Sequence, residues 1–240
     1  KRDMRKEREI GERFMKEYPK SQYVSDVLNT LGRHAAEGGR YQEAAGYFET
    51  MGQSFKGEAT GLDSTLAAAR LRMAMGDYPA AMKALDSAAE QAGARKAEVL
   101  VLIAQTRMKM KEPEKARAVA EQVLKLDKVN SAAAAIVAEV QASNRGNEKT
   151  DALVALLTQV TNSPTGQNED TAKALWYLGE IMYRQYKALS ADQVEQKVTM
   201  LQQMQGIYNQ AASMGSAEWT VASLWRIGNG LQHIADAVEA

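Results

Sequence analysis

The sequence contains no cysteine, and it has only two histidines, three phenylalanines and four prolines among 240 residues. Without cysteine the chain forms no disulfide, no thiolate zinc site and no cysteine nucleophile. Exported and intracellular proteins both occur without cysteine, so this absence identifies no compartment. Few prolines and few runs of β-branched residues, in a chain rich in alanine and leucine, predict an all-α fold.

An excess of charge of either sign is also absent. Thirty basic residues balance thirty acidic ones, so the formal net charge is zero. Domains that bind nucleic acid through a general basic surface usually carry an excess of lysine and arginine on one face. We therefore expect no nucleic-acid partner.

No apolar run approaches the roughly 18 residues that span a bilayer, and no signal peptide is recognisable. We expect no membrane insertion by this part of the protein. The chain begins at Lys1, within a charged helical pattern and without an initiator methionine. We therefore expect it to be an excised fragment, for which a missing targeting segment carries no information.

Motifs that carry chemistry are absent as well. The sequence has no His-Glu-x-x-His zinc motif, no phosphate-binding Gly-Lys loop and no Gly-x-Ser-x-Gly elbow. Its two histidines, His34 and His233, lie near opposite ends of the chain. We therefore expect a protein that is not an enzyme, with no catalytic residue, no metal site and no cofactor.

The clearest pattern that is present is a pair of amphipathic segments within residues 18–55. Both carry apolar residues at three- and four-residue spacing, which predicts two helices that pack through one stripe each. These residues are Leu28, Leu31 and Ala35 on the first segment and Ala44, Tyr47, Phe48 and Met51 on the second. Gly38 and Gly39 between the segments predict a tight turn. Gly32 lies inside the first helix, where we expect it to let the two backbones approach closely.

This hairpin resembles the tetratricopeptide repeat, a family built from helical hairpins of about 34 residues. The matching residues are Leu31-Gly32, Gly39-Arg40-Tyr41, Ala44 and Phe48. The turn recurs at Gly76-Asp77-Tyr78, and the Leu-Gly pair recurs at Leu178-Gly179 and, with isoleucine, at Ile227-Gly228. The resemblance implies an all-α, right-handed superhelical solenoid of about six such hairpins.

A cluster of breaker residues at 163–170 predicts an internal boundary. We expect amino-terminal repeats with a leading helix at 1–162, a break loop at 163–170 and carboxy-terminal repeats at 171–240, and we expect these last repeats to continue beyond the fragment. Asp170 or Thr171 is expected to cap the helix after the break. Ser190 or Asp192 is expected to cap the following helix, and residues 144–147 are predicted to form a turn.

Two segments resemble particular branches of the family. Residues 14–21 are similar to the repeat junction of bacterial envelope members. Parts of 208–237 are similar to the carboxy-terminal repeats of large periplasmic proteins of delta-proteobacteria, some of which belong to gliding-motility machinery. The resemblance implies a cell-envelope protein in the periplasm, and the cytoplasm remains the alternative.

In such a solenoid, the first helix of each hairpin lines a concave groove that binds a protein or peptide partner. The residues in those positions are Asn29, Arg33, Arg70, Met73, Gln105, Met108, Lys109, Glu139, Trp176, Glu180, Tyr183, Arg184, Trp225, Asn229 and Gln232. Several have a specific structural alternative. Met73 and Met108 could be core residues, Trp176 and Trp225 could pack against the next repeat, and Arg33 and Arg70 could pair with a glutamate of the neighbouring helix.

The sequence thus predicts a protein–protein interaction scaffold that binds a partner segment in its groove. One alternative is a structural spacer without a groove ligand, for which Trp176 and Trp225 would be buried. The other is a regulatory or recruiting domain of a larger enzyme. The partner and the oligomeric state are left open.

Overall fold

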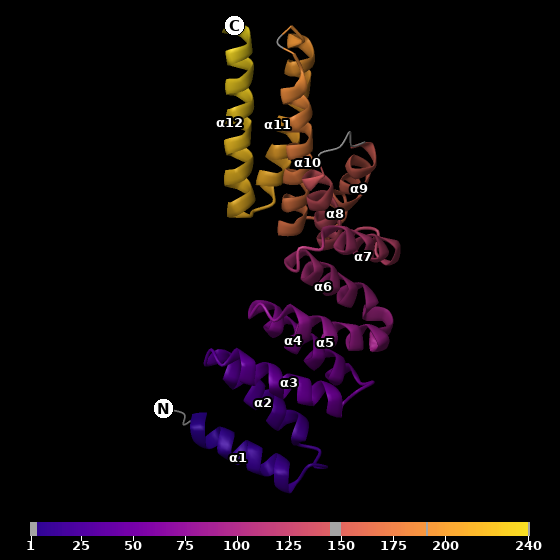
Figure 1. Cartoon of the computed structure of the whole chain (residues 1–240), viewed down its shortest axis with the longest axis vertical. Coiled ribbons are helices and arrows are strands. Elements are labelled where there is room, and N and C mark those ends of the chain that lie inside the picture. The colour runs from indigo at the N-terminus through magenta and orange to yellow at the C-terminus, as the bar shows by residue number, and fades with distance from the viewer. Residues whose placement is uncertain (1–3, 145–149, 191, 240) are drawn as a thin grey trace. The chain divides into compact units, whose positions relative to one another are not determined.

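The structure, a computed structural model, describes residues 4–144, 150–190 and 192–239. Over these residues it contains twelve α-helices, one short 3-10 turn and no strand, with consecutive helices forming hairpins (Figure 1). The predicted all-α fold of helical hairpins is confirmed. The chain divides into two compact units, residues 1–111 and residues 112–240.

In the first unit, each helix packs against the next one along the chain. The helices are α1 (Met4–Glu17), α2 (Val24–Glu37), α3 (Tyr41–Ser54), α4 (Ala59–Ala74), α5 (Tyr78–Gln91) and α6 (Lys96–Lys109), the last preceded by a 3-10 turn at Gly93–Arg95. Their shared apolar stripes form the core, in which Leu28, Leu66, Leu85 and Val99 are almost fully buried.

Two turns of this unit form where the glycines predict them. Gly39 and Gly76 have φ angles of 74° and 76°, which favour a residue without Cβ. Asp77 follows Gly76 and caps α5, because its Oδ1 accepts a hydrogen bond from the Ala80 amide at 3.3 Å. Pro79 lies in the first turn of α5, where a missing backbone donor has no cost.

The second unit contains the remaining helices. These are α7 (Pro113–Leu126), α8 (Ser131–Ser143), α9 (Asp151–Thr161), α10 (Glu169–Ala188), α11 (Val194–Ser213) and α12 (Ala217–Glu239). Helix α8 is rich in alanine and packs against both α7 and α10, and most of its side chains are buried there. Helix α10 also packs against α9, α11 and α12.

The helix caps of this unit differ from those predicted. Asn168, rather than Asp170 or Thr171, caps α10, because its Oδ1 accepts from the Thr171 amide at 3.0 Å. Its extended backbone starts the helix two residues before Thr171, which is buried inside it. Helix α11 follows Gln193 and has no side-chain cap, so neither Ser190 nor Asp192 plays that role.

Two other predictions from the sequence are neither confirmed nor contradicted by the structure. Of the turn predicted at 144–147, only Asn144 lies within the described residues. The division of the repeats at 163–170 stays a prediction, and this loop joins α9 to α10 within one compact unit.

Close packing within two hairpins depends on a glycine beneath an aromatic ring. A Cβ atom at Gly32 would lie 2.9 Å from Cζ of Phe48 on α3, and one at Gly179 would lie 2.5 Å from Cζ of Tyr208 on α11. The close approach of two backbones predicted at Gly32 is wrong, because the side-chain ring of Phe48 lies against this glycine. In both hairpins the missing Cβ leaves room for an aromatic side chain of the second helix.

We predict that Gly179→Ala destabilises the second unit. The Tyr208 ring is fully buried and its hydroxyl donates to Glu180 at 2.9 Å, so it cannot move aside freely. Overpacking of about 1–3 kcal/mol outweighs the helix-propensity gain of up to about 1 kcal/mol. Urea unfolding followed by tryptophan fluorescence measures this change, because the tryptophans at 176, 219 and 225 all lie in this unit.

The matched control is Gly206→Ala in α11, where nothing lies within 4 Å of the added Cβ. This variant should be as stable as the parent chain or slightly more stable. An unchanged urea midpoint for Gly179→Ala would contradict the account of the glycine contact.

Candidate partner-binding site

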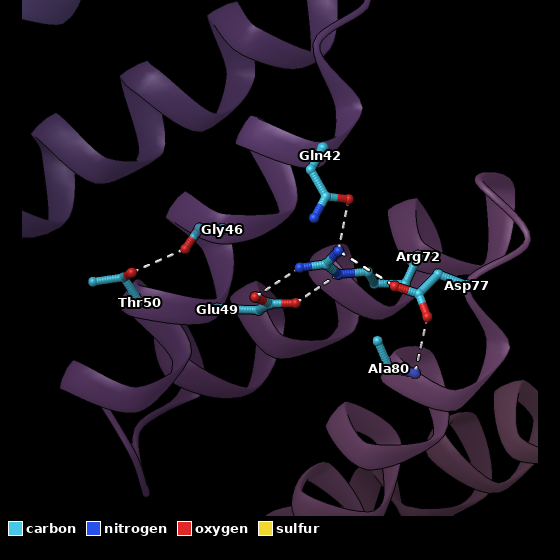
Figure 2. A network of polar contacts seen from close by, with 7 residues as sticks. All are labelled: Gln42, Gly46, Glu49, Thr50, Arg72, Asp77 and Ala80. Atoms are coloured by element: carbon cyan, nitrogen blue, oxygen red, sulfur yellow. Dashed lines mark hydrogen bonds and ion pairs between the residues drawn. The ribbon is translucent and has the colours of Figure 1, made fainter.

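A buried arginine links three helices of the first unit. Arg72 on α4 is 9% exposed, and Figure 2 shows its guanidinium facing Glu49, with Gln42 and Asp77 beside it. Nε and Nη2 donate to the two carboxylate oxygens of Glu49 on α3, at 2.8 and 3.0 Å. This bidentate geometry fits the planar fork of arginine. The hydrogen bond to Glu49 raises the pKa of Arg72 further above its usual range.

The third nitrogen, Nη1, extends the link to the start of α5. It donates to Gln42 Oε1 at 2.8 Å and to Asp77 Oδ2 at 3.4 Å, while the other oxygen of Asp77 caps α5. One guanidinium therefore connects α3, its own helix α4 and the N-terminus of α5. We conclude that Arg72 orients one hairpin relative to the next.

A pocket of about 420 Å³ opens beside this link, between α3 and α5 and with α4 as its floor. Its rim includes Lys56, after the end of α3, and Lys83 on α5. Neither lysine makes an ion pair with a described residue, whereas both oxygens of Glu49 are already bonded to Arg72. The pocket therefore carries a local excess of positive charge that suits an acidic side chain. Most residues that line the pocket belong to the second helices α3 and α5, which the predicted groove positions do not include.

The candidate residues of α2, α4 and α6 lie elsewhere, and none of them lines this pocket. Asn29, Arg33, Arg70 and Lys109 are exposed, and Met73, Gln105 and Met108 are half-buried. Exposure of these four side chains is what a binding role requires.

The two arginines have glutamate neighbours, as the structural alternative proposed. Arg33 pairs with Glu37 of its own helix at 3.9 Å, and Arg70 pairs with Glu98 of α6 at 3.0 Å. Exposed pairs of this kind contribute at most about 1 kcal/mol. A partner carboxylate can therefore compete for either arginine at little cost.

In the second unit, most candidate residues are engaged within the chain. Arg226 on α12 donates from Nε and Nη2 to the two oxygens of Glu180, each at 2.5 Å. The Tyr208 hydroxyl donates to the same carboxylate, and burial, followed by the charge of Glu180, raises the pKa of Tyr208. Tyr183 is 8% exposed, with the Arg226 guanidinium 4.4 Å from its ring centroid. Glu180 and Tyr183 thus join α10 to α11 and α12.

The other candidates on α8 and α10 also have internal neighbours. Trp176 packs against Trp219 with ring centroids 5.4 Å apart. Arg184 donates to the Ala142 carbonyl at the end of α8, and Glu139 pairs with Lys173 at 2.6 Å.

The candidates on α12 are more accessible. Trp225 is 63% exposed, Gln232 is exposed and Asn229 is half-buried. The spacer alternative predicts that both Trp176 and Trp225 are buried. Trp176 packs against Trp219, but Trp225 is exposed, so only half of that prediction is met. Trp225 is therefore the most accessible aromatic candidate of the second unit.

Another cluster of this unit places a histidine beside a buried lysine. Lys197 is 2% exposed, with its Nζ 3.5 Å from Nε2 of His233 and 5.1 Å from the ring centroid of Tyr186. Burial lowers the pKa of His233, and the charges of Lys197 and Lys187 lower it further, while Asp236 acts in the opposite direction. The fold therefore favours neutral His233.

We predict that the second unit loses stability as the pH falls. An unfolded histidine titrates near pH ~6.5. Because the pKa of His233 is lower in the folded chain, the unfolded chain binds more protons once the pH falls below ~6.5. The stability that neutral His233 contributes is therefore fully present above pH ~6.5 and is lost on acidification. Urea midpoints from tryptophan fluorescence at pH 7.5 and pH 5 measure the difference. His233→Gln should reduce it, and an identical pH dependence in this variant would contradict the prediction.

We also predict that Arg72→Met destabilises the first unit by about 2 kcal/mol, because it removes several charge-assisted hydrogen bonds and leaves Glu49 and Gln42 without them. Arg70→Met, two residues away in an exposed pair, should cost less than about 1 kcal/mol. Hydrogen exchange of peptides from α3 to α5, measured by mass spectrometry, reports both changes. Equal effects of the two variants would refute the role given to Arg72.

No helix in the described part of the chain is long and apolar enough to cross a membrane. Within the same residues, no group of three or more metal-ligating side chains is placed to hold an ion. No curated protein matches the chain. Residues 73–140, from the end of α4 into α8, match the family model described as tetratricopeptide repeat. This match identifies residues 73–140 as similar to the tetratricopeptide repeat, and the consecutive helical hairpins fit a helical solenoid of that kind.

Proposed function

We propose that this chain is a non-enzymatic scaffold that binds a segment of another protein. The observation that carries the proposal is the match to the tetratricopeptide repeat, because such repeats generally mediate protein–protein interactions. Helical hairpins of this kind offer an extended surface along their stacked helices rather than one enclosed pocket.

The proposed binding surface is the exposed side of the first helices α2, α4 and α6. Arg33, Arg70 and Lys109 contribute three exposed cations there, and Asn29 adds a hydrogen-bonding side chain. Met73 and Met108 are half-buried and offer adaptable apolar contacts. A partner segment with acidic residues beside apolar ones fits this combination, with the charges setting its register.

The proposed setting is a cell-envelope assembly in the bacterial periplasm, including assemblies of the gliding-motility type. Its support is the resemblance of residues 14–21 and 208–237 to envelope members of the family. Fractionation of cells that express the full-length protein tests this setting. Recovery in the cytoplasmic fraction alone would reject it.

We predict that Arg33→Glu combined with Arg70→Glu weakens partner binding at least tenfold. Both side chains are exposed, so reversing their charge should leave the helical content unchanged. Partners captured from an envelope lysate are identified by mass spectrometry, and each purified partner is then titrated against the parent chain and the variant. Binding to the parent chain should also weaken as salt is raised, because exposed charges are screened.

The charge-matched control is Lys56→Glu combined with Lys83→Glu, which reverses two cations at the pocket between α3 and α5. This pair should leave binding unchanged. Loss with the control pair alone would place the partner in that pocket. Failure of the parent chain to bind any purified partner would favour the spacer, and a captured enzyme that is active only with this chain would favour the recruiting domain.

A further inference from the structure

The pocket between α3 and α5 has an equivalent one hairpin earlier, between α1 and α3. There, two side chains of α3 reach across to the preceding helix. The Tyr47 hydroxyl donates to Glu12 Oε1 at 2.7 Å, and Glu43 Oε1 accepts from Arg8 Nη1 at 3.4 Å. An aromatic ring and a carboxylate therefore bridge the space between α1 and α3.

The corresponding residues of α5 are too small to reach across. Helices α3 and α5 each begin at the tyrosine of a Gly-x-Tyr turn and have the same length, so their positions correspond one to one. On this alignment Ala80 stands in the place of Glu43. Ala84 stands in the place of Tyr47. Because both alanines line the pocket, the space that a carboxylate and a ring fill in the earlier hairpin is left open here.

The helices that enclose this pocket are consecutive members of one unit. Helix α4 packs against both α3 and α5, and all three lie in the first unit. The opening therefore results from the side chains of α5 and not from the lack of a neighbouring helix. Its volume of about 420 Å³ lies within the range of roughly 300–1,000 Å³ that is typical of small-ligand sites.

Two lysines give the pocket a preference for negative charge. Lys56 and Lys83 are exposed, and neither has an ion-pair partner among the described residues. The backbone beside Lys56 is anchored to α5, because Gln91 Oε1 accepts from the Gly57 amide at 2.9 Å. The same side chain is fixed at its other end, where Nε2 donates to the Ser87 carbonyl at 3.0 Å. The chain therefore holds the backbone that carries Lys56 at the rim of the pocket.

The carboxylate in the lining does not neutralise these lysines. Both oxygens of Glu49 are bonded to Arg72, as Figure 2 shows, so this pair carries no net charge. Gln53 and Ser87 also line the pocket and can donate hydrogen bonds from their side chains. A bound group with negative charge and hydrogen-bond acceptors would complement this lining.

We propose that this pocket binds a carboxylate attached to an aromatic ring. Lys56 and Lys83 pair with the carboxylate. The ring lies against Ala80 and Ala84, in the place that Tyr47 holds one hairpin earlier. A free aromatic acid and a peptide with an acidic residue near a tyrosine both offer this chemistry. The site is separate from the surface proposed on α2, α4 and α6, whose candidate residues do not line it.

The test uses two probes. One is desaminotyrosine, which is tyrosine without its amino group, and the other is the pentapeptide Glu-Ala-Ala-Gly-Tyr with blocked ends, which copies residues 43–47. Each is titrated into the isotope-labelled full chain while the backbone amide NMR signals of α3 and α5 are followed. We expect saturable shifts, and at least tenfold weaker binding of the uncharged amide of desaminotyrosine. Tighter binding of the pentapeptide would identify a protein segment as the source of the carboxylate, and tighter binding of desaminotyrosine would identify a small molecule.

Lys56→Gln combined with Lys83→Gln removes both cations, and we expect it to weaken binding of the tighter probe at least tenfold. The charge-matched control is Lys20→Gln combined with Lys96→Gln, because these two lysines are exposed and lie outside the pocket. The control pair should bind the probe as the parent chain does.

Ala84→Tyr fills the proposed ring position without a change of charge, and we expect it to weaken binding at least tenfold. Because the added ring enters open space, this variant should melt at the same temperature as the parent chain or a higher one. Ala84→Ser leaves the space open and should bind the probe as the parent chain does.

Three results would overturn the proposal. The first is that neither probe binds saturably, and the second is that the uncharged amide binds as tightly as desaminotyrosine. The third is that the Lys56→Gln and Lys83→Gln variant, or Ala84→Tyr, binds as tightly as its control. The Arg33→Glu and Arg70→Glu variant should bind the probe normally, so failure here is distinguishable from failure of the proposed function.

Discussion

The contact between a glycine of one helix and an aromatic ring of the next is the constraint on which the packing of two hairpins depends. Phe48 over Gly32 and Tyr208 over Gly179 occupy space that any Cβ would take. The ring buries a large apolar area, and the glycine lets it lie directly on the helix backbone. The cost of glycine within a helix is thereby offset by packing that no other residue permits.

Arginines add orientation to this apolar packing. Arg72 bonds to Glu49 of α3 and to Asp77 at the start of α5, and Arg226 bonds to Glu180 of α10, which also accepts from Tyr208 of α11. Arg72 thus connects three helices directly, whereas Arg226 connects α12 to α10 and reaches α11 through Glu180. Hydrogen bonds of this kind are directional, whereas apolar stripes alone permit sliding. The two units use the same device with unrelated residues.

The local features of the fold were predictable from the sequence. Gly39 and Gly76 form the predicted turns because a left-handed backbone angle is decided by the residue that adopts it. The alanine-rich stretch of α8 is buried because small side chains permit close neighbours. The cap of α10 was misplaced because Asn168, Asp170 and Thr171 are all good capping residues and only the backbone selects among them.

The candidate site depends on contacts between distant residues, and there the sequence was less informative. Nothing in helical spacing distinguishes buried Arg72 from exposed Arg70, because the partner of Arg72 lies on another helix. Glu180 and Tyr183 match groove positions of the family, yet Arg226 of the last helix engages both. The exposed row of α2, α4 and α6 remains a proposal that binding data must test.

The leucine and glycine positions of the first helices differ in how they are covered. Where a following helix is present, the leucine and the glycine of the first helix are covered, as at Leu175 and Gly179. Helix α12 presents the same pattern without such a cover among the described residues, and its Trp225 is exposed as a result. Among the described residues, the Trp225 side of α12 is therefore open, whereas the corresponding sides of α2 and α10 are covered.

Hydroxyl-radical footprinting of the full chain at low concentration, with oxidation of each tryptophan quantified by mass spectrometry, tests this claim most directly. The account predicts rapid oxidation of Trp225 and slow oxidation of Trp176, which packs against Trp219. Equal protection of Trp225 and Trp176 would contradict the account, because the Trp225 side of α12 would then already be covered.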